Sequence, residues 1–266
     1  MLDLEFAELS DCGSSREDNE DFLGHVLPAS PAQVQSQGWL FALADGMGGH
    51  EHGEVASRLA VESILAGFRK IPKGVMHASL LPRLVQEANA AVYDAGHAKQ
   101  SHAPRMGTTL IACALRFDSA VISHAGDSRC YLFRNGALSP LTRDHTMADE
   151  QLRLGVLSSK EAVKGDGRHI LSRCLGSVLF VAADTITVNV IPGDLLLMCT
   201  DGLHGYVPDA SIQRLLRARP DLDQAAKALV DAANEAGGHD NVSVQLIRIR
   251  SVERMGLYRG RPYRLL

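Results

Sequence analysis

The chain has 266 residues, of which 45% are hydrophobic, and its formal net charge is −4 at pH 7. A chain of this size can bury a substantial core in one large domain or two small ones, and its negative charge argues against nucleic acid as a partner. No apolar run reaches the roughly 20 residues that span a bilayer, the acidic N-terminus shows no secretion signal, and five cysteines without a C-x-x-C pair predict free thiols in the cytoplasm.

The expected elements are long amphipathic helices and short apolar strands. In chain order they are a strand at 39–44, helices at 54–68 and 79–99, strands at 109–115, 129–134, 137–141 and 194–200, helices at 209–219 and 221–236, and a strand at 242–249. The first helix repeats apolar residues at i, i+3, i+4 and i+7 from Val61 to Phe68. Asp221 can cap the last helix, which Gly237-Gly238 ends.

The order of these elements predicts an α+β fold. Strands follow strands from 109 to 141, where Asn135-Gly136 indicates a tight hairpin because both residues of its turn need positive φ. Residues 142–173 are more polar and include a capping box of Ser158 and Glu161, so we expect an excursion from the sheet that acts as a flap. We therefore expect one domain over residues 1–250 and a basic, solvated tail over 251–266, with docking as the tail's alternative role.

Acidic residues recur where apolar runs end or turn. They are Glu20 and Asp21, Asp45 before Gly46, Asp127 after Gly126, Asp201 before Gly202, and Asp240 before Asn241. Each alone is ordinary turn chemistry, since aspartate bonds its own backbone and glycine supplies positive φ. Together, the four Asp sites that adjoin apolar runs predict carboxylates converging at one end of a sheet. Such carboxylates repel each other unless cations bind them.

The chemistry that these acids favour is two-metal hydrolysis. Oxygen ligands suit Mg²⁺ or Mn²⁺ rather than zinc, and glycine beside Asp45 lets the backbone carbonyl come close enough to be a ligand. Two such metals about 4 Å apart can bridge a water, lower its pKa and direct it at phosphorus. Arg16 is the candidate for gripping the phosphate, because its planar fork matches two oxygens; taken alone, a surface salt bridge is the alternative.

Eight short segments contain these residues and their neighbours. In chain order they are S-S-R-E-D-N-E-D (14–21), A-D-G-M-G-G-H-E-H-G-E-V-A-S (44–57), M-G-T-T-L (106–110), A-G-D-S-R-C-Y (125–131), L-T-R-D-H-T (141–146), L-S-R-C-L-G (171–176), L-L-L-M-C-T-D-G-L (195–203) and G-G-H-D-N-V-S-V (237–244). The set resembles the metal-dependent PP2C-type (PPM) Ser/Thr phosphatase family in its bacterial form. One segment would be weak, whereas eight in the family's order, over about residues 10 to 250, are very specific.

The resemblance implies an α/β/β/α sandwich of two antiparallel sheets between helices, with a binuclear Mn²⁺ or Mg²⁺ centre between the sheets. The implied metal ligands are Glu20, Asp21, Asp45, Gly46 through its carbonyl, Asp127, Asp201 and Asp240, and the implied catalytic residues are Arg16, Asp45 and Asp201. Asp45 would bridge both metals and Arg16 would bind the substrate phosphate. Asp127 and Asp201 would hold a third, weaker ion, and residues 142–173 match the family's flap.

Two positions depart from the family's pattern. Met47 follows Asp45-Gly46 where some members have a histidine assigned as general acid; His50 and His52 lie nearby in a glycine-rich loop, but neither is assigned that role. Gly205 stands where many relatives have another aspartate, which weakens the expectation of a third metal without affecting the central pair.

The resemblance also implies a partner, a phosphorylated protein that is the target of a Ser/Thr kinase or the kinase itself, and we expect a monomer. One rival hypothesis is a non-catalytic binding module of the same fold, but no central acid is missing. A second is a phosphohydrolase that acts on nucleotides or small phosphoesters, which two-metal chemistry alone does not exclude. A third, a structural or interaction protein without chemistry, leaves the acidic cluster unexplained.

Overall fold

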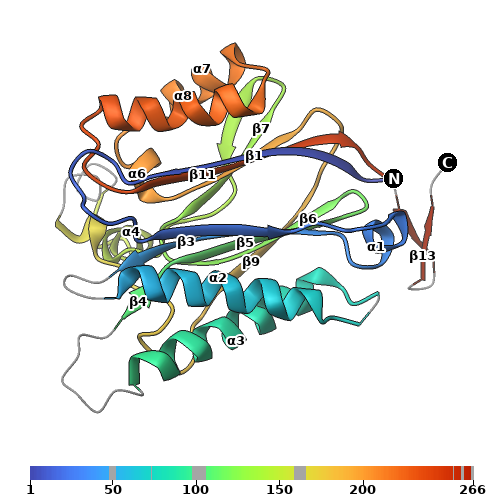
Figure 1. The fold of residues 1–266 in the computed structure, drawn as a ribbon, viewed down its shortest axis with the longest axis horizontal. Helices are drawn as coiled ribbons and strands as arrows, with labels where there is room; N and C mark the ends of the chain where they lie inside the picture. The colour runs from blue at the N-terminus through green and yellow to red at the C-terminus, as the bar shows by residue number, and fades with distance from the viewer. Residues whose placement is uncertain are drawn as a thin grey trace.

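Two antiparallel sheets stack face to face in the computed structural model, which describes residues 1–47, 52–72, 74–97, 106–158, 166–253, 255–258 and 261–264 (Figure 1). The first sheet has the order β1 (Asp3–Asp11), β11 (Val242–Ser251), β10 (Leu195–Cys199), β7 (Arg129–Arg134) and β8 (Ala137–Pro140). The second has the order β2 (Asp21–Val26), β3 (Trp39–Met47), β5 (Leu110–Arg116), β6 (Ser119–Ala125) and β9 (Asp184–Asn189), and the short β4 (Gly107–Thr108) pairs with β3.

Helices cover the outer face of each sheet (Figure 1). The described helices are α1 (Pro31–Ser36), α2 (Gly53–Arg69), α3 (His77–His97), α4 (Met147–Arg153), the 3₁₀ helix η1 (Asp166–His169), α6 (Asp201–His204), α7 (Asp209–Ala218) and α8 (Leu222–Glu235). Helices α2 and α3 lie on the second sheet, whereas α7 and α8 lie on the first. The α/β/β/α sandwich predicted from the motifs is confirmed.

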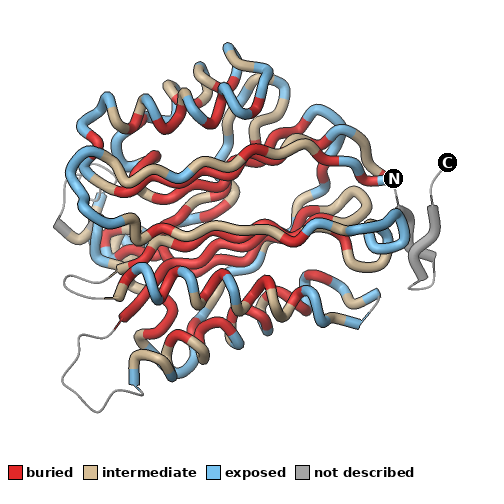
Figure 2. Tube along the Cα trace, viewed as in Figure 1, coloured by how far each residue is buried: buried red, intermediate tan, exposed pale blue. Residues whose placement is uncertain are grey.

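Apolar side chains form three layers of core, which follow the layers of the fold. One cluster fills the space between the two sheets and includes Phe41, Ile111 and Ile247. A second lies between the second sheet and helices α2 and α3, and a third between the first sheet and helices α7 and α8. Figure 2 shows the central strands buried along most of their length and the helices exposed on their outer faces. The central strands are therefore buried on both faces, which explains their continuous apolar runs.

Local signals in the sequence predicted several elements well. Asn135 and Gly136 adopt φ of 52° and 78°, as the hairpin turn between β7 and β8 requires. The side chain of Asp221 accepts a hydrogen bond of 2.9 Å from the backbone N–H of Gln224 and so caps α8. Helices α2 and α3 occupy the expected regions, except that residues 98 and 99 at the end of the second predicted helix lie outside the described residues.

Other elements were not expected from the sequence. The edge strands β1, β2 and β9 and the inner strand β6 have no place in the predicted list. The three edge strands mix polar with apolar residues and are buried only in part. Within residues 251–266, where only a solvated tail was predicted, β12 (Met255–Tyr258) pairs with β13 (Arg261–Arg264). Of the predicted capping box, Glu161 lies outside the described residues.

Candidate active site

A cavity of about 420 Å³ opens at one end of the sandwich, and most of the predicted site residues line it. Its lining consists of Arg16, Glu20, Asp45, Gly46, Met47, Thr109, Asp127, His169, Leu171, Asp201, Tyr206 and Asp240. The one predicted residue missing from this lining is Asp21, which lies opposite Asp45 in the pairing of β2 with β3 and is only 7% exposed. The sandwich thus gathers acids that are more than 200 positions apart in the chain, from Glu20 to Asp240.

Strand β3 places Asp45 and Gly46 at the cavity, and their backbone is tightly held. The N–H of Asp45 donates to Oγ1 of Thr109 at 2.9 Å, and its carbonyl accepts from Oγ1 of Thr108 at 2.8 Å. A Cβ added at Gly46 would lie 2.2 Å from the carbonyl oxygen of Gly53, at the start of α2. Glycine at position 46 is therefore required by the close approach of another backbone segment.

Short turns after the strands place the remaining aspartates. Gly126 has φ of 112°, and an added Cβ would come within 2.6 Å of the Thr109 side chain, so the turn that carries Asp127 depends on glycine. Asp201 is the first residue of α6, and Thr200 alone separates it from β10. A Cβ on Gly202 would lie 1.9 Å from the carbonyl oxygen of Asn241, so glycine brings Asp201 close to the turn that follows Asp240.

Burial and the neighbouring negative charges raise the pKa values of the carboxyl groups at this end. Burial raises the pKa of Asp45 well above its usual range, and the charge of Asp21 raises it further. Burial likewise raises the pKa of Asp21 to about 7 and that of Asp127 to about 7. The pKa of Asp201 is also raised, first by burial and then by the charge of Asp240. Such shifts are expected where acids gather without balancing cations from the protein.

Bound cations fit this donor set. Oδ1 of Asp21 is buried and accepts no hydrogen bond from the described residues, although Oδ2 accepts from Oγ1 of Thr200 at 2.9 Å. The charge of Asp201 contributes to the raised pKa of Asp45, and neighbouring carboxyls of this kind can share either a proton or a cation. In the described parts of the chain, no three His, Cys, Asp or Glu side chains stand at metal-binding spacing. Hard oxygen donors of this kind suit Mg²⁺ or Mn²⁺.

Arg16 lies at the cavity in an ion pair with Asp240. Its Nη2 is 3.0 Å from a carboxylate oxygen of that residue, and about half of the Arg16 side chain is exposed. The guanidinium is therefore both close to the acids and open to solvent.

Several cavity residues were not singled out from the sequence. His169 and Leu171 reach the cavity from the flap segment, and Tyr206 reaches it from the turn after α6. His169 and Tyr206 lie outside the eight segments singled out in the sequence, and Leu171 begins one of them but was given no role. The packing of the flap places His169 and Leu171 at the cavity, and the turn after α6 places Tyr206 there. Met47 lines the cavity as well, His52 precedes α2, and His50 lies outside the described residues.

Comparison with known proteins identifies the family. The family model for protein phosphatase 2C matches residues 14–246. A serine/threonine phosphatase, stp, of Listeria innocua is 34% identical over 255 residues, which cover 95% of this chain and 96% of that protein. The chain therefore belongs to the protein phosphatase 2C family, and the family and enzyme class predicted from its motifs, a protein-serine/threonine phosphatase, are confirmed.

Solved structures agree with the fold. The serine/threonine phosphatase PstP/Ppp of Mycobacterium tuberculosis is 32% identical, with a TM-score of 0.81 over 94% of this chain and all (100%) of that one. The catalytic domain of PstP solved with two manganese ions is 31% identical, with a TM-score of 0.79 over 94% of this chain and 100% of that one. These similarities extend over nearly the whole length of both partners.

Proposed function

We propose that this protein removes phosphate from phosphoserine and phosphothreonine residues of other proteins, using two divalent cations, Mn²⁺ or Mg²⁺, in the cavity. The observation that carries the proposal is the cavity itself, which is lined by mutually repelling carboxyl groups and by the guanidinium of Arg16. The manganese ions in the related PstP structure support the choice of metal. When bound, such ions lower the pKa of water and neutralise charge on the phosphate.

The roles that we propose for the site residues follow from their positions. Asp45, whose backbone is tied to Thr108 and Thr109, would contact both ions, and the neighbouring Gly46 would offer its carbonyl. Asp201 and Asp240 would hold one ion on the side of the first sheet, and Glu20 and Asp21 would ligate from β2 and the turn before it.

Arg16 would bind two oxygens of the substrate phosphate and orient the phosphorus for in-line attack. Its present partner, Asp240, would exchange the guanidinium for a cation when the site is loaded. Asp127 with Asp201 is the proposed site of a third, weaker ion, and Gly205 supplies no side chain there.

The proposed substrates are proteins phosphorylated by a Ser/Thr kinase, or such a kinase itself. We also propose that the protein acts in the cytoplasm as a monomer. Support for this compartment comes from the cysteines, all five of which are free and three of which are buried. Among the described residues, no helix is both long and apolar enough to cross a membrane.

Hydrolysis of a phosphothreonine peptide by the purified protein tests the proposal, in the presence of Mn²⁺, of Mg²⁺, and of EDTA. We expect metal-dependent release of phosphate that disappears in Asp45→Ala. A folded protein that releases no phosphate with either metal would contradict the proposal and favour the rival hypothesis of a binding module.

A further inference from the structure

The flap segment, residues 142–173, leaves the sandwich through a narrow neck in which its two ends pair with each other. The N–H of Met147 donates to the carbonyl of Ile170, and the N–H of Ser172 donates to the carbonyl of His145, each at 2.8 Å. Thr146 and Leu171 form an isolated β-bridge between these bonds. Because Leu171 also lines the cavity, the position of the neck sets the position of one cavity wall.

His145, at the start of the neck, forms two hydrogen bonds with the turn that carries Asp127. Its backbone N–H donates to the carbonyl of Gly126 at 3.0 Å, and its Nδ1 accepts from the N–H of Gly126 at 3.2 Å. The ring stacks on His124 of β6, with centroids 4.6 Å apart, and His124 itself donates from Nε2 to the carbonyl of Arg143. With Nδ1 accepting, the proton of the neutral ring lies on Nε2, which is 3.3 Å from a carboxylate oxygen of Asp184.

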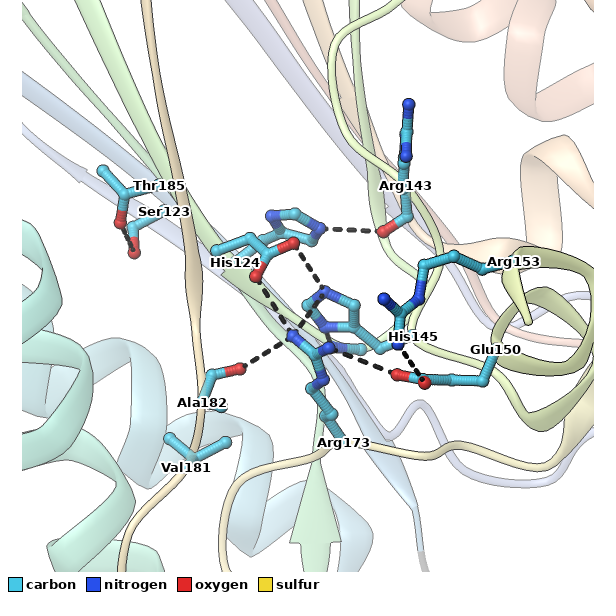
Figure 3. A network of polar contacts seen from close by, with 12 residues as sticks. Ser123, His124, Arg143, His145, Glu150, Arg153, Arg173, Val181, Ala182 and Thr185 are labelled. Atoms are coloured by element: carbon cyan, nitrogen blue, oxygen red, sulfur yellow. Dashed lines mark hydrogen bonds and ion pairs between the residues drawn. The ribbon is translucent and has the colours of Figure 1, made fainter.

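Arg173, at the other end of the neck, reaches the same carboxylate. Figure 3 shows its guanidinium between His145 and Glu150. Its Nη1 lies 3.0 Å from Oδ1 of Asp184, and its Nη2 lies 3.2 Å from Oε1 of Glu150 in α4. Arg173 therefore connects α4, the helix of the flap, to β9 of the second sheet. Glu150 is also paired with Arg153 of the same helix. Asp184, the first residue of β9, thus contacts both ends of the flap neck, His145 at one end and Arg173 at the other.

We propose that Asp184 and Arg173 are positioning residues of the phosphatase site: together with His145 they hold the flap neck against the Gly126–Asp127 turn and so fix the flap wall of the cavity relative to its carboxylates. The proposal rests on the proposed function, since it concerns how a substrate is bound in that cavity. Neither residue lines the cavity, so they act through Leu171 and the turn before Asp127.

The geometry predicts a particular kinetic signature. A neck released from Asp184 leaves the acids of β3 and α6 in place, because their backbone bonds lie elsewhere. The flap wall and the Gly126 turn lose their fixed positions, so binding of a phosphoprotein suffers more than the chemical step. Loss of a partly exposed ion pair predicts about a fivefold rise in KM for a phosphothreonine peptide, with kcat changed less than about twofold.

The experiment compares Asp184→Ala, Arg173→Ala and the conservative Arg173→Lys at saturating Mn²⁺. We expect the raised KM in both alanine variants and a KM close to that of the parent in Arg173→Lys, which keeps a cation beside Asp184. Amide hydrogen exchange, measured on the same proteins without substrate, should become about tenfold faster at Gly126 and Ser172 in the alanine variants.

Arg134→Ala is the matched control. Arg134 also pairs with an aspartate, Asp194, and with a backbone carbonyl, that of Asn189, but none of these three residues lines the cavity. We expect it to lower stability and leave KM and the exchange at Gly126 unchanged.

Two results would overturn the inference. One is a KM and an exchange rate at Gly126 that stay at parental values in Asp184→Ala and Arg173→Ala; the other is an equal rise in KM in Arg134→Ala. If the parent protein hydrolyses no phosphopeptide, the proposed function fails, whereas the exchange measurement still decides whether Asp184 holds the neck.

Discussion

Strand β10 has an aspartate near each end, and the two differ in whether the fold supplies a cation to balance their charge. Asp194, just before the strand, is 1% exposed and accepts hydrogen bonds from Nε and Nη2 of Arg134 at 2.8 and 2.6 Å and from the N–H of Ile191. Asp201, just after the strand, lies among other carboxyls, and its pKa is raised by burial and by the charge of Asp240.

The difference separates a structural acid from a functional one. At the end with Asp194 the chain supplies the cation and a backbone donor, so the charge is compensated within the fold. At the end with Asp201 it supplies more acids and, among the cavity residues, the guanidinium of Arg16. An acidic cluster that the protein leaves uncompensated indicates a site where positive charge comes from outside.

The largest effect that we expect from this contrast is on activity. Asp201→Asn keeps the shape of the side chain but removes a proposed metal ligand, so kcat/KM should fall at least ~1000-fold, or about 4 kcal/mol. Its free energy of unfolding in EDTA should not fall, because one repelling charge is removed. Phosphopeptide hydrolysis and thermal melts measure the two quantities. Activity retained with saturating metal would remove Asp201 from the metal site.

Metal binding should stabilise the folded chain through the same end of β10. At a Mn²⁺ concentration near 100 times its dissociation constant, the free energy of unfolding should rise by about 2.7 kcal/mol relative to EDTA. Differential scanning calorimetry measures the shift. Asp201→Asn should lose most of this gain and Arg134→Ala should keep it; an equal gain in both variants would show that the metal binds elsewhere.

Removing the ion pair between Arg134 and Asp194 should lower the free energy of unfolding and leave activity unchanged. Arg134→Ala leaves the buried carboxylate of Asp194 without its cation, which we expect to cost about 2 kcal/mol, less than for a fully buried pair because about a third of the arginine is exposed. Urea unfolding measures the loss, and kcat should remain at the parental value. A loss of activity without a loss of stability would reverse the distinction between the two ends.

The smallest expected effect comes from replacing Arg16, the arginine that lines the cavity. Arg16→Ala should raise KM for the phosphopeptide by about tenfold, since ground-state phosphate binding is lost along with some transition-state stabilisation. Arg16→Lys should recover only part of this, because an ammonium cannot grip two phosphate oxygens in a plane. Initial-rate kinetics over a range of substrate concentrations provide the test, and an unchanged KM would place Arg16 outside the phosphate site.

Local patterns in the sequence determined many of the elements, several of their ends and the family. The hairpin at Asn135-Gly136 and the cap at Asp221 depend on neighbouring residues alone, so they could be predicted without the fold. Glycine beside Asp45, Asp127 and Asp201 is also visible in the sequence and pointed to the acids that line the cavity, but the close contacts that require these glycines come from distant segments, and the roles of the acids as ligands stay predictions.

Only the tertiary structure decided which distant groups meet. The register of β2 on β3 puts Asp21 opposite Asp45, and the packing of β9 against β6 brings Asp184 to both ends of the flap. Arg134 and Asp194 are 60 positions apart, and nothing near either residue in the chain indicates the other. Pairings of this kind are set by strand register and layer packing, which depend on the whole buried surface rather than on any short segment.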